Sequence, residues 1–197
     1  VSFVGPILPD FPDESQEALK KKFGFDPEAP LIYIGISGPR EERKKLTNIL
    51  DKICEKIPKK YGVIYSRGEP SSIPPERKDN VLVYNWLEQR TEALRACDIY
   101  IGRSGASSLF EALALGKKII TIPARNQIEQ TGNASRIEDL GAGIMIREEN
   151  LSEHTLLSAI EKLESMPVNT EIQRIIRKYD GKKKLANVIL SLLFRIS

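Results

Sequence analysis

The sequence predicts an α/β fold: a doubly wound, Rossmann-like parallel sheet of about six strands with helices on both faces. Two observations lead to this prediction. Short apolar runs alternate with amphipathic segments along the chain, as strands and helices do in a parallel sheet. The connectors between them are short, and no Gly- or Ser-rich linker divides them, so residues 1–197 are expected to form a single domain.

Residues 1–30 are expected to form a connector and a short helix. An apolar stretch at 1–9 leads into a turn, and 12–22 is expected to be helical with Asp13 as its N-cap. The stretch lacks the cationic start and the long apolar segment of a signal peptide. Because the chain opens with Val1 rather than Met, we expect it to be a piece of a longer protein.

Residues 31–180 are expected to form the Rossmann-like core, with a strand at each of six apolar runs. The first run is continuously apolar, which is typical of a strand buried on both faces. The expected strands are 31–36, 62–66, 81–84, 98–101, 118–122 and 143–146. The segment 67–80 holds three prolines and is expected to be a polar loop.

Helices are expected between and after these strands. Following the turn at 37–39, a charged segment carries Leu46, Ile49 and Leu50 at helical spacing. The other expected helices are 88–97, 106–115 and 130–140, then three near 152–165, 170–179 and 182–195. The last of them lies in 181–197, which is assigned to a C-terminal helix of the domain.

Composition excludes several classes of protein and of site. With 30 Lys and Arg against 27 Asp and Glu, the net charge is +3, a weak field for a polyanion, so no nucleic acid partner is expected. No apolar run approaches the roughly 20 residues of a membrane-spanning helix. Two cysteines cannot form a disulfide framework, which favours a reducing cytosol. The single histidine, His154, is interpreted as a surface or capping residue, and no metal site is expected.

The turn at 102–108 is the first candidate binding site, because it joins a buried strand to a helix. Its small residues let a ligand approach the backbone, and the helix start offers unpaired N–H groups that suit a phosphate. Ser104, Ser107 and Ser108 add hydroxyl donors. The alternative is a purely structural turn, with glycines for geometry and serines as caps. The dinucleotide-binding fingerprint is not matched, since its third glycine is missing.

Two further candidates follow this turn. Glu111 lies one turn of helix beyond Ser107 and is expected to face the same crevice, where a carboxylate suits ribose hydroxyls. The alternative is an exposed glutamate that gains only from the helix dipole. The segment 123–134 is rich in Arg, Asn and Gln, which suits sugar hydroxyls, with a solvated loop as the alternative. The turn at 37–39 is a minor candidate, for which a structural role is favoured.

Taken together, these segments resemble the C-terminal, donor-binding half of the GT-B glycosyltransferases. The resemblance is carried by DIYIGRSGASSLFEALALGKKIITIP at 98–123, by 127–130, by GNA at 132–134 and by LGAG at 140–143. The order of these parts is similar to that of family 28, of the MurG-like, UDP-N-acetylglucosamine transferase type. Outside them, from residue 31 onward, the likeness is one of layout rather than of residues.

The resemblance implies a diphosphate site in the turn that follows Gly102. The residues assigned to it are Ser37, Arg103, Ser104, Gly105, Ala106 and Ser107. The sequence departs from the family pattern around Ser37, where Ile36 and Pro39 stand in place of the usual glycines. This departure weakens the case for a phosphate contact through Ser37.

The resemblance also implies positions for the rest of a UDP-sugar. Glu111 is expected to bind the ribose. The sugar itself is assigned to Asn126, Gln127 and Gln130. Trp86 and Leu87 are expected to lie against the uracil, mainly through their backbone, although for Trp86 we favour the alternative of a core aromatic residue.

The implied function is that of a UDP-sugar donor-binding domain, with UDP-N-acetylglucosamine as the expected donor, in an inverting glycosyltransferase that needs no metal or other cofactor. In the family, the acceptor site and the catalytic base lie in an N-terminal half. No catalytic residue is therefore expected in this chain, which would be inactive without that half, whether joined to it or supplied by a partner subunit. The expected location is the cytoplasm, at the inner face of the membrane for a full enzyme whose acceptor is a membrane lipid.

Two other functions remain open at this stage. An epimerase or hydrolase of nucleotide sugars with the GT-B fold would share the UDP site and differ in the missing half. A non-catalytic donor-binding subunit of a two-part transferase would carry the same site, but is expected to begin with Met close to its first strand. The stretch before residue 31 looks instead like a connector within a single chain.

Overall fold

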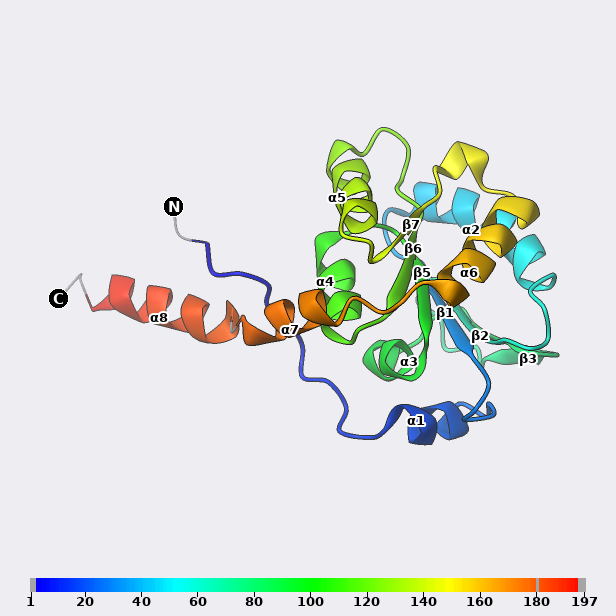
Figure 1. Cartoon of the computed structure of the whole chain (residues 1–197), viewed down its shortest axis with the longest axis horizontal. Coiled ribbons are helices and arrows are strands. Elements are labelled where there is room, and N and C mark those ends of the chain that lie inside the picture. The colour runs from blue at the N-terminus through cyan, green and yellow to red at the C-terminus, as the bar shows by residue number, and fades with distance from the viewer. Residues whose placement is uncertain (1–2, 180, 195–197) are drawn as a thin grey trace.

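A computed structural model describes residues 3–179 and 181–194 of the chain (Figure 1). Val1, the core boundary expected at residue 180 and the helix end expected at residue 195 lie outside these residues. Within them, a seven-stranded sheet runs through the centre in the order β3-β4-β2-β1-β5-β6-β7. The strands are β1 (Leu31–Gly35), β2 (Gly62–Ser66), β3 (Glu76–Lys78), β4 (Val81–Tyr84), β5 (Ile99–Gly102), β6 (Lys118–Thr121) and β7 (Gly143–Met145).

The sheet is doubly wound, as the sequence predicts. Every neighbouring pair of strands is parallel except β3 and β4, which are antiparallel. From β1 the chain builds outward through β2 to β4, and then returns to the other side of β1 with β5. This reversal leaves a crevice between the loops that follow β1 and β5, where ligands of open parallel sheets bind.

Helices cover both faces of the sheet (Figure 1). Residues of α2 and α6 pack in the core on one face, and residues of α1, α3, α4, α5 and α7 pack in the core on the other. Their bounds are α1 (Gln16–Lys22), α2 (Arg40–Cys54), α3 (Arg90–Ala96), α4 (Ala106–Ala114), α5 (Ile128–Asp139), α6 (Glu153–Ser165) and α7 (Thr170–Lys178). A short 3-10 helix, η1 (Glu148–Asn150), precedes α6, and α8 (Gly181–Leu193) follows α7.

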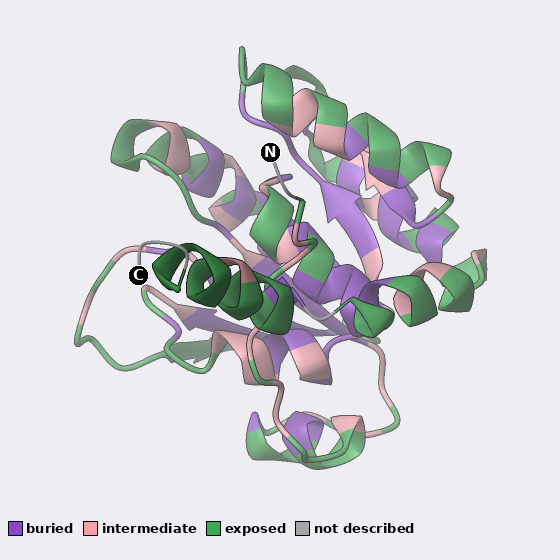
Figure 2. Ribbon diagram, turned by 90° about the vertical axis from the view of Figure 1, so that its left-hand side faces the viewer, coloured by how far each residue is buried: buried purple, intermediate pink, exposed green. Residues whose placement is uncertain are grey.

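The central strands β1, β2 and β5 are buried on both faces, which explains their largely apolar sequences. In β1, Ile32 and Ile34 belong to the core beneath α2 and α6, whereas Leu31 and Tyr33 belong to the core on the opposite face. Because successive strand residues point to opposite faces, neither set can be polar without a partner. Figure 2 shows burial concentrated in the strands and on the inward sides of the helices.

Two expectations for the first half of the chain are wrong. The segment 67–80 is not a loop throughout, because it contains β3, whose side chains are all exposed. An edge strand is ordered by backbone hydrogen bonds to its neighbour and needs no apolar pattern, so the sequence shows no sign of it. The first helix begins at Gln16 rather than at residue 12, because Ser15, and not Asp13, caps it by accepting a hydrogen bond from the Ala18 N–H at 3.2 Å.

The last helix and the N-terminal segment meet away from the sheet. The backbone of Gly181 passes so close to Pro6 that a Cβ at this glycine would lie 2.8 Å from the Pro6 carbonyl carbon. Next to it, Lys182 Nζ lies 2.7 Å from a carboxylate oxygen of Asp10. From there α8 projects away from the body of the protein (Figure 1). Within residues 3–179 and 181–194, no helix combines the length and the apolar character needed to cross a membrane.

Candidate functional site

Two tyrosines form the floor of the crevice between β1 and β5. Tyr33 and Tyr100 are paired across the two strands, with ring centroids 5.8 Å apart. Both side chains point along their strands toward the carboxyl edge of the sheet. Tyr33 thus lies beside Gly35, and Tyr100 lies beside Gly102. A Cβ at Gly35 would lie 2.9 Å from Tyr33 Oη, and one at Gly102 would lie 2.7 Å from Tyr100 Cζ. The two glycines therefore leave the space that the tyrosine hydroxyls occupy.

Burial keeps these hydroxyls protonated. It raises the pKa of Tyr100 to about 12, and it raises the pKa of Tyr33 as well. At neutral pH each hydroxyl can therefore donate as well as accept a hydrogen bond. Sequence reasoning missed both residues, although a signal was present: Tyr-x-Gly occurs at the end of each of the two strands that flank the crevice.

A cavity of about 220 Å³ opens above this floor. Its walls come from the loop after β1, the loop between β4 and α3, and the first turn of α4. The lining residues are Tyr33, Gly35, Ile36, Ser37, Ser66, Gly68, Trp86, Leu87, Glu88, Arg90, Tyr100 and Ser108. Three of the predicted site residues, Ser37, Trp86 and Leu87, thus come together here.

Trp86 is not a core residue, and the favoured interpretation of it is wrong. The residue is 47% exposed and lines the cavity, whereas the neighbouring Leu87 is buried. The loop that carries them is held by the loop after β2, where the Arg67 backbone N–H donates to the Tyr84 carbonyl at 2.9 Å. The Arg67 guanidinium also donates to Asn85 Oδ1 at 3.2 Å. These bonds fix a segment that apolar packing alone would not place.

The start of α4 faces open space beside this cavity. Gly105 is the N-cap residue, and no side chain caps the helix. A Cβ built on Gly105 would have no heavy atom within 4 Å, while Ala106 and Ser107 are exposed. The glycine is therefore not required by packing, and the first N–H groups of α4 are within reach of a ligand.

The side chains that precede this helix start face inward. Ser104 is fully buried, and its hydroxyl donates to the Gln130 carbonyl at 2.7 Å. The Ser104 carbonyl in turn accepts from Asn133 Nδ2 at 3.0 Å. These bonds tie the turn after β5 to α5, so the Ser104 hydroxyl is already committed, and a diphosphate contact at this position would come from the backbone.

Arg103 is also buried and committed. Its guanidinium lies 2.5 Å from Glu148 Oε2 and donates to the carbonyls of Ile122 and Glu42 at 3.1 and 3.3 Å. It thus joins the loops that follow β5, β6 and β7 to the first turn of α2. In this structure the predicted diphosphate ligand acts as a clamp for the carboxyl edge of the sheet, rather than offering its charge at the surface.

Glu111 is buried, so the alternative of an exposed glutamate is wrong. Its side chain is 7% exposed, and Oε2 lies 2.5 Å from Nη2 of Arg90, which lines the cavity. The two atoms form a close charge pair rather than an aligned hydrogen bond. Among the described residues, Glu111 has no other ion pair or side-chain hydrogen bond. Sequence reasoning missed Arg90, because the two residues lie on different helices.

The residues predicted to bind the sugar lie at the start of α5. Asn126 and Gln127 are exposed, and Asn126 has a left-handed backbone conformation with φ of 61°. Gln130 is half-buried, and its Oε1 accepts a hydrogen bond from the Ala124 N–H at 3.0 Å. This bond orients the Gln130 amide and leaves its Nε2 hydrogens for another acceptor.

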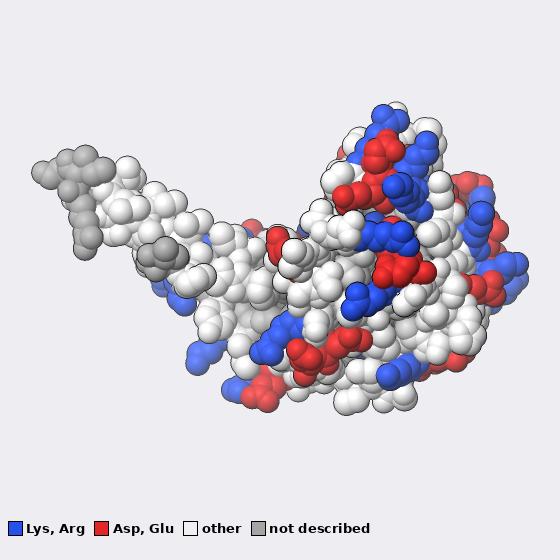
Figure 3. Space-filling view, turned by 90° about the horizontal axis from the view of Figure 1, so that it is seen from above, with Lys and Arg blue, Asp and Glu red and all other residues white. Residues whose placement is uncertain are grey.

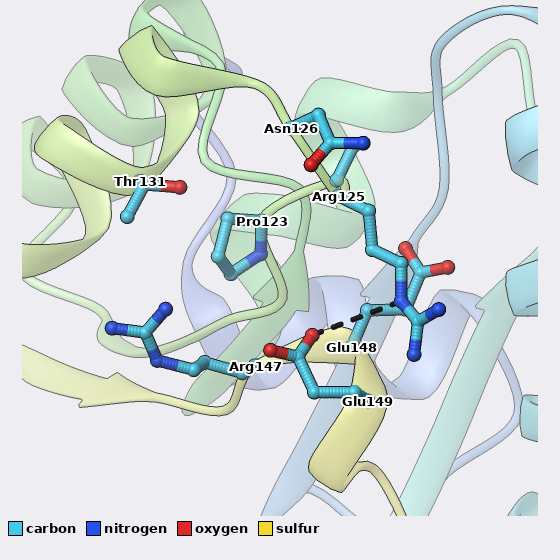
Figure 4. A pocket seen from close by; sticks show the side chains of 8 residues that line it. Pro123, Arg125, Asn126, Thr131, Arg147, Glu148 and Glu149 are labelled. Carbon is cyan, nitrogen blue, oxygen red and sulfur yellow. Dashed lines mark ion pairs between the residues drawn. The ribbon is translucent and has the colours of Figure 1, made fainter.

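Asn126 also lines a second, more open cavity of about 380 Å³ (Figure 4). The other lining residues are Pro123, Ala124, Arg125, Thr131, Arg147, Glu148 and Glu149. Figure 4 shows Arg125 and Glu149 pointing toward each other, with 3.8 Å between Nε and Oε2, whereas the Arg147 side chain extends away from this pair. The space thus adjoins the predicted sugar-binding loop and carries charge of both signs.

Charges elsewhere are dispersed. In the face shown in Figure 3, Lys and Arg alternate with Asp and Glu over the body of the protein.

His154 is exposed near the start of α6, where Ser152 is the capping residue. Among the described residues, no three His, Cys, Asp or Glu side chains gather as a candidate metal site.

The sequence comparison decides the family. The model of the glycosyltransferase family 28 C-terminal domain matches residues 41–189, more than half of the chain. The chain belongs to glycosyltransferase family 28. The matched region includes the turn after β5, Glu111 and Gln130, whereas Ser37 and Tyr33 lie before it. The resemblance seen in the sequence is thus confirmed for the family.

Named relatives of this family 28 domain are glycosyltransferases. An uncharacterised glycosyltransferase of Methanopyrus kandleri is 26% identical over 189 residues, which cover 92% of this chain and 51% of that protein. In Oenococcus oeni, the UDP-N-acetylglucosamine--N-acetylmuramyl-(pentapeptide) pyrophosphoryl-undecaprenol N-acetylglucosamine transferase is 29% identical over 187 residues, or 89% of this chain and 50% of the relative. The family 28 domain therefore spans about half the length of the relatives it matches.

Solved structures share the fold. The calicheamicin glycosyltransferase CalG4 has a TM-score of 0.72 at 19% identity, and the match covers 100% of this chain and 49% of that one. MurG of Acinetobacter baumannii has a TM-score of 0.63 at 18% identity, covering 94% of this chain and 59% of that one. At these identities the likeness shows the fold alone. It agrees with the GT-B fold expected for a family 28 domain.

Proposed function

We propose that this family 28 domain binds a UDP-sugar at the carboxyl edge of β1 and β5, and serves as the donor-binding half of an inverting glycosyltransferase. The observation that carries the proposal is the pairing of two features at one edge. The start of α4 is open and has no side-chain cap, and a cavity of about 220 Å³, lined by both apolar and polar residues, lies directly beside it. A nucleoside diphosphate needs both, since its phosphates suit a helix N-terminus and its nucleoside suits an enclosed pocket.

The diphosphate would lie against the backbone of Gly105, Ala106 and Ser107. The N–H groups there point along the axis of α4, whose dipole favours negative charge at this end. When the bond between the sugar and UDP breaks, charge develops on the departing diphosphate, and pre-oriented N–H groups stabilise it without reorganising. We therefore expect the leaving group to need no metal ion.

The nucleoside would enter the cavity above Tyr33 and Tyr100. Glu111 supplies the carboxylate for the ribose hydroxyls, and the backbone around Leu87 faces the uracil, with Trp86 at the open side. Gln130, held by the Ala124 N–H, turns its amide toward the sugar, with Asn126 and Gln127 nearby. N-acetylglucosamine is our choice of sugar because the name of the Oenococcus oeni relative contains UDP-N-acetylglucosamine.

The rest of the reaction would depend on a second half. In an inverting displacement, an acceptor hydroxyl attacks the anomeric carbon, the bond to the UDP oxygen breaks, and the hydroxyl proton passes to a base. We assign no residue of this chain to that base, and expect an N-terminal half, covalently joined or separate, to supply it with the acceptor site. A membrane lipid as acceptor, and a place at the cytoplasmic face of the membrane, belong to the same proposal.

Calorimetric titration of the chain with UDP, UDP-N-acetylglucosamine and GDP tests the donor site. We expect both uridine nucleotides to bind and GDP to bind more weakly, since guanine is larger than uracil and the buried Tyr33 and Tyr100 form the floor of the cavity. A His154→Ala variant is the matched control, because this exposed residue lies outside the site, and its affinities should equal those of the unchanged chain. Failure of both uridine nucleotides to bind, or a preference for GDP, would contradict the proposal.

A further inference from the structure

We infer that Arg90 is a positioning residue for the nucleotide: it neutralises the buried Glu111 carboxylate and orients it toward the ribose. The inference rests on the proposed function and concerns a residue to which neither the sequence motifs nor the family match assign a role. It starts from a charge pair that joins the wall of the nucleoside cavity to the predicted ribose ligand, Arg90 Nη2 to Glu111 Oε2 at 2.5 Å.

The charge of the pair suits an anionic ligand. Glu111 is buried near the middle of α4, the helix whose start is proposed to hold the diphosphate. A lone carboxylate there would repel the phosphates in surroundings of low dielectric, where charge interactions are much stronger than in water. Arg90 supplies one positive charge in contact with that carboxylate. The pair is neutral, so the site can hold an acceptor for the ribose without penalising an anionic ligand.

The place of Arg90 in its own helix also points to a role outside that helix. It is the first residue of α3, where the helix dipole disfavours a cation. Gln89, the N-cap residue, makes no side-chain capping bond that would offset this placement. An arginine at this position therefore does not stabilise α3. Its contact with Glu111 on α4 explains its presence better.

Part of the Glu111 carboxylate remains available to a ligand. Arg90 lies against Oε2, and among the described residues no other ion pair or hydrogen bond to the Glu111 carboxylate is found. A carboxylate can accept several hydrogen bonds. With Oε2 held by the guanidinium, the orientation of Oε1 is fixed, which is what selective recognition of a ribose hydroxyl requires.

The test measures ribose selectivity in the full chain. Dissociation constants for UDP and 2′-deoxy-UDP are determined for the unchanged chain and for Arg90→Met, Arg90→Lys and Glu111→Gln. Arg95→Met is the matched control, because Arg95 lies on the same helix but donates to the Glu14 carbonyl instead of contacting the cavity. We expect the unchanged chain and the control to prefer UDP by about tenfold or more, the typical cost of losing a hydrogen bond to a charged group.

Arg90→Met and Glu111→Gln should each lose most of the preference for UDP over 2′-deoxy-UDP. A double variant that carries both substitutions should lose no more than either single variant. Arg90→Lys, which keeps the charge, should retain part of the preference. A residue that only braces α3 against α4 would lower the melting temperature while leaving the preference intact, and that result would overturn the inference. Should Arg90→Met fail to fold, Arg90→Gln replaces it.

The same experiment separates the inference from the proposed function. If the unchanged chain binds neither nucleotide, the proposed function fails and the inference fails with it. If the unchanged chain binds UDP selectively, and Glu111→Gln abolishes the preference while Arg90→Met keeps it, the proposed function stands and Arg90 has no positioning role.

Discussion

At the scale of single residues, the floor of the crevice depends on two glycines. Gly35 and Gly102 stand where a side chain would collide with the end of the tyrosine two positions earlier. Gly105, three residues beyond Gly102, faces open space. Packing thus requires glycine at the first two positions, whereas at Gly105 we propose that glycine leaves the N–H groups of α4 open to the diphosphate. We therefore expect a substitution at Gly102 to change the stability of the fold, and a substitution at Gly105 to change ligand binding instead.

Gly102→Ala is expected to destabilise the fold. The added Cβ would lie 2.8 Å from the Gly35 carbonyl oxygen and would overlap the Tyr100 hydroxyl, and neither strand backbone can yield. Overpacking of this kind costs about 1–3 kcal/mol in the free energy of unfolding. Urea denaturation followed by circular dichroism measures it. An unchanged midpoint would show that Tyr100 does not occupy the space beneath this glycine.

The two cysteines are expected to be inert in the folded protein. Cys54 and Cys97 are both buried, and burial raises the pKa of the Cys97 thiol to about 12 and that of Cys54 as well. A free thiol with a pKa near 8.5 is about half ionised at pH 8.5, whereas these two remain protonated there. A chromogenic thiol reagent at pH 8.5 should therefore react slowly with the native chain and rapidly in denaturant. Rapid reaction of the native chain would contradict the packing of these strands and helices.

At the scale of elements, α4 is the part of the fold that the proposed chemistry uses most. The turn before it is held by Ser104 and Arg103, whose bonds reach α5, α2 and the loops after β6 and β7. A helix N-terminus stabilises an anion only if it stays in place during the reaction, and these buried bonds fix it. The turn and its helix are predictable from the sequence, but the buried bonds of Arg103 and Ser104 are not, because their partners lie far away along the chain.

Gly105→Ala is expected to weaken phosphate binding without affecting stability. The N-cap residue has φ of −67°, which alanine adopts readily, and its Cβ would meet no protein atom. The new methyl group would instead stand where the diphosphate approaches the N–H groups. We expect the affinity for UDP to fall about tenfold, the loss of one charge-assisted hydrogen bond, and that for uridine to change little. Equal losses for UDP and uridine would place the phosphates elsewhere.

The elements themselves were predictable to different degrees. Buried strands such as β1 and β5 are evident from their apolar runs, and α2 from its helical spacing. By contrast, β3 could not be found, because an exposed edge strand is held by backbone bonds that leave no pattern in the side chains. Trp86 and Arg90 were misjudged or missed for a similar reason: exposure and cross-helix pairing are properties of the assembled fold, not of local sequence.

At the scale of the whole molecule, the fold brings residues from both halves of the chain to one edge. Tyr33 and Ser37 come from the first strand and its loop, and Trp86, Ser108 and Glu111 from segments far along the chain. The topology alone explains this meeting, because the sheet reverses its order at β1. The donor site would thus be complete within this chain, although the chain spans about half the length of its relatives.

Binding of UDP is therefore expected to stabilise the chain by itself. A ligand that binds the native state alone adds about 2.7 kcal/mol at a concentration 100 times its dissociation constant. The melting temperature should rise with UDP, and by the same amount in the presence of EDTA, since the proposed site holds the diphosphate through N–H groups. If EDTA abolished the rise in melting temperature, a bound metal ion rather than the N–H groups would hold the phosphates.

An NMR titration of the isotope-labelled chain with UDP, followed through its amide resonances, maps the nucleotide site most directly. The proposed site lies between the start of α4 and the cavity over Tyr33 and Tyr100. We predict that the largest shifts fall on Gly105, Ala106 and Ser107, and on Leu87 in the cavity wall. Residues at the opposite edge of the sheet, such as Lys117, should not shift. Saturating UDP that leaves the start of α4 unshifted, or that shifts the opposite edge, would show that the nucleotide binds elsewhere.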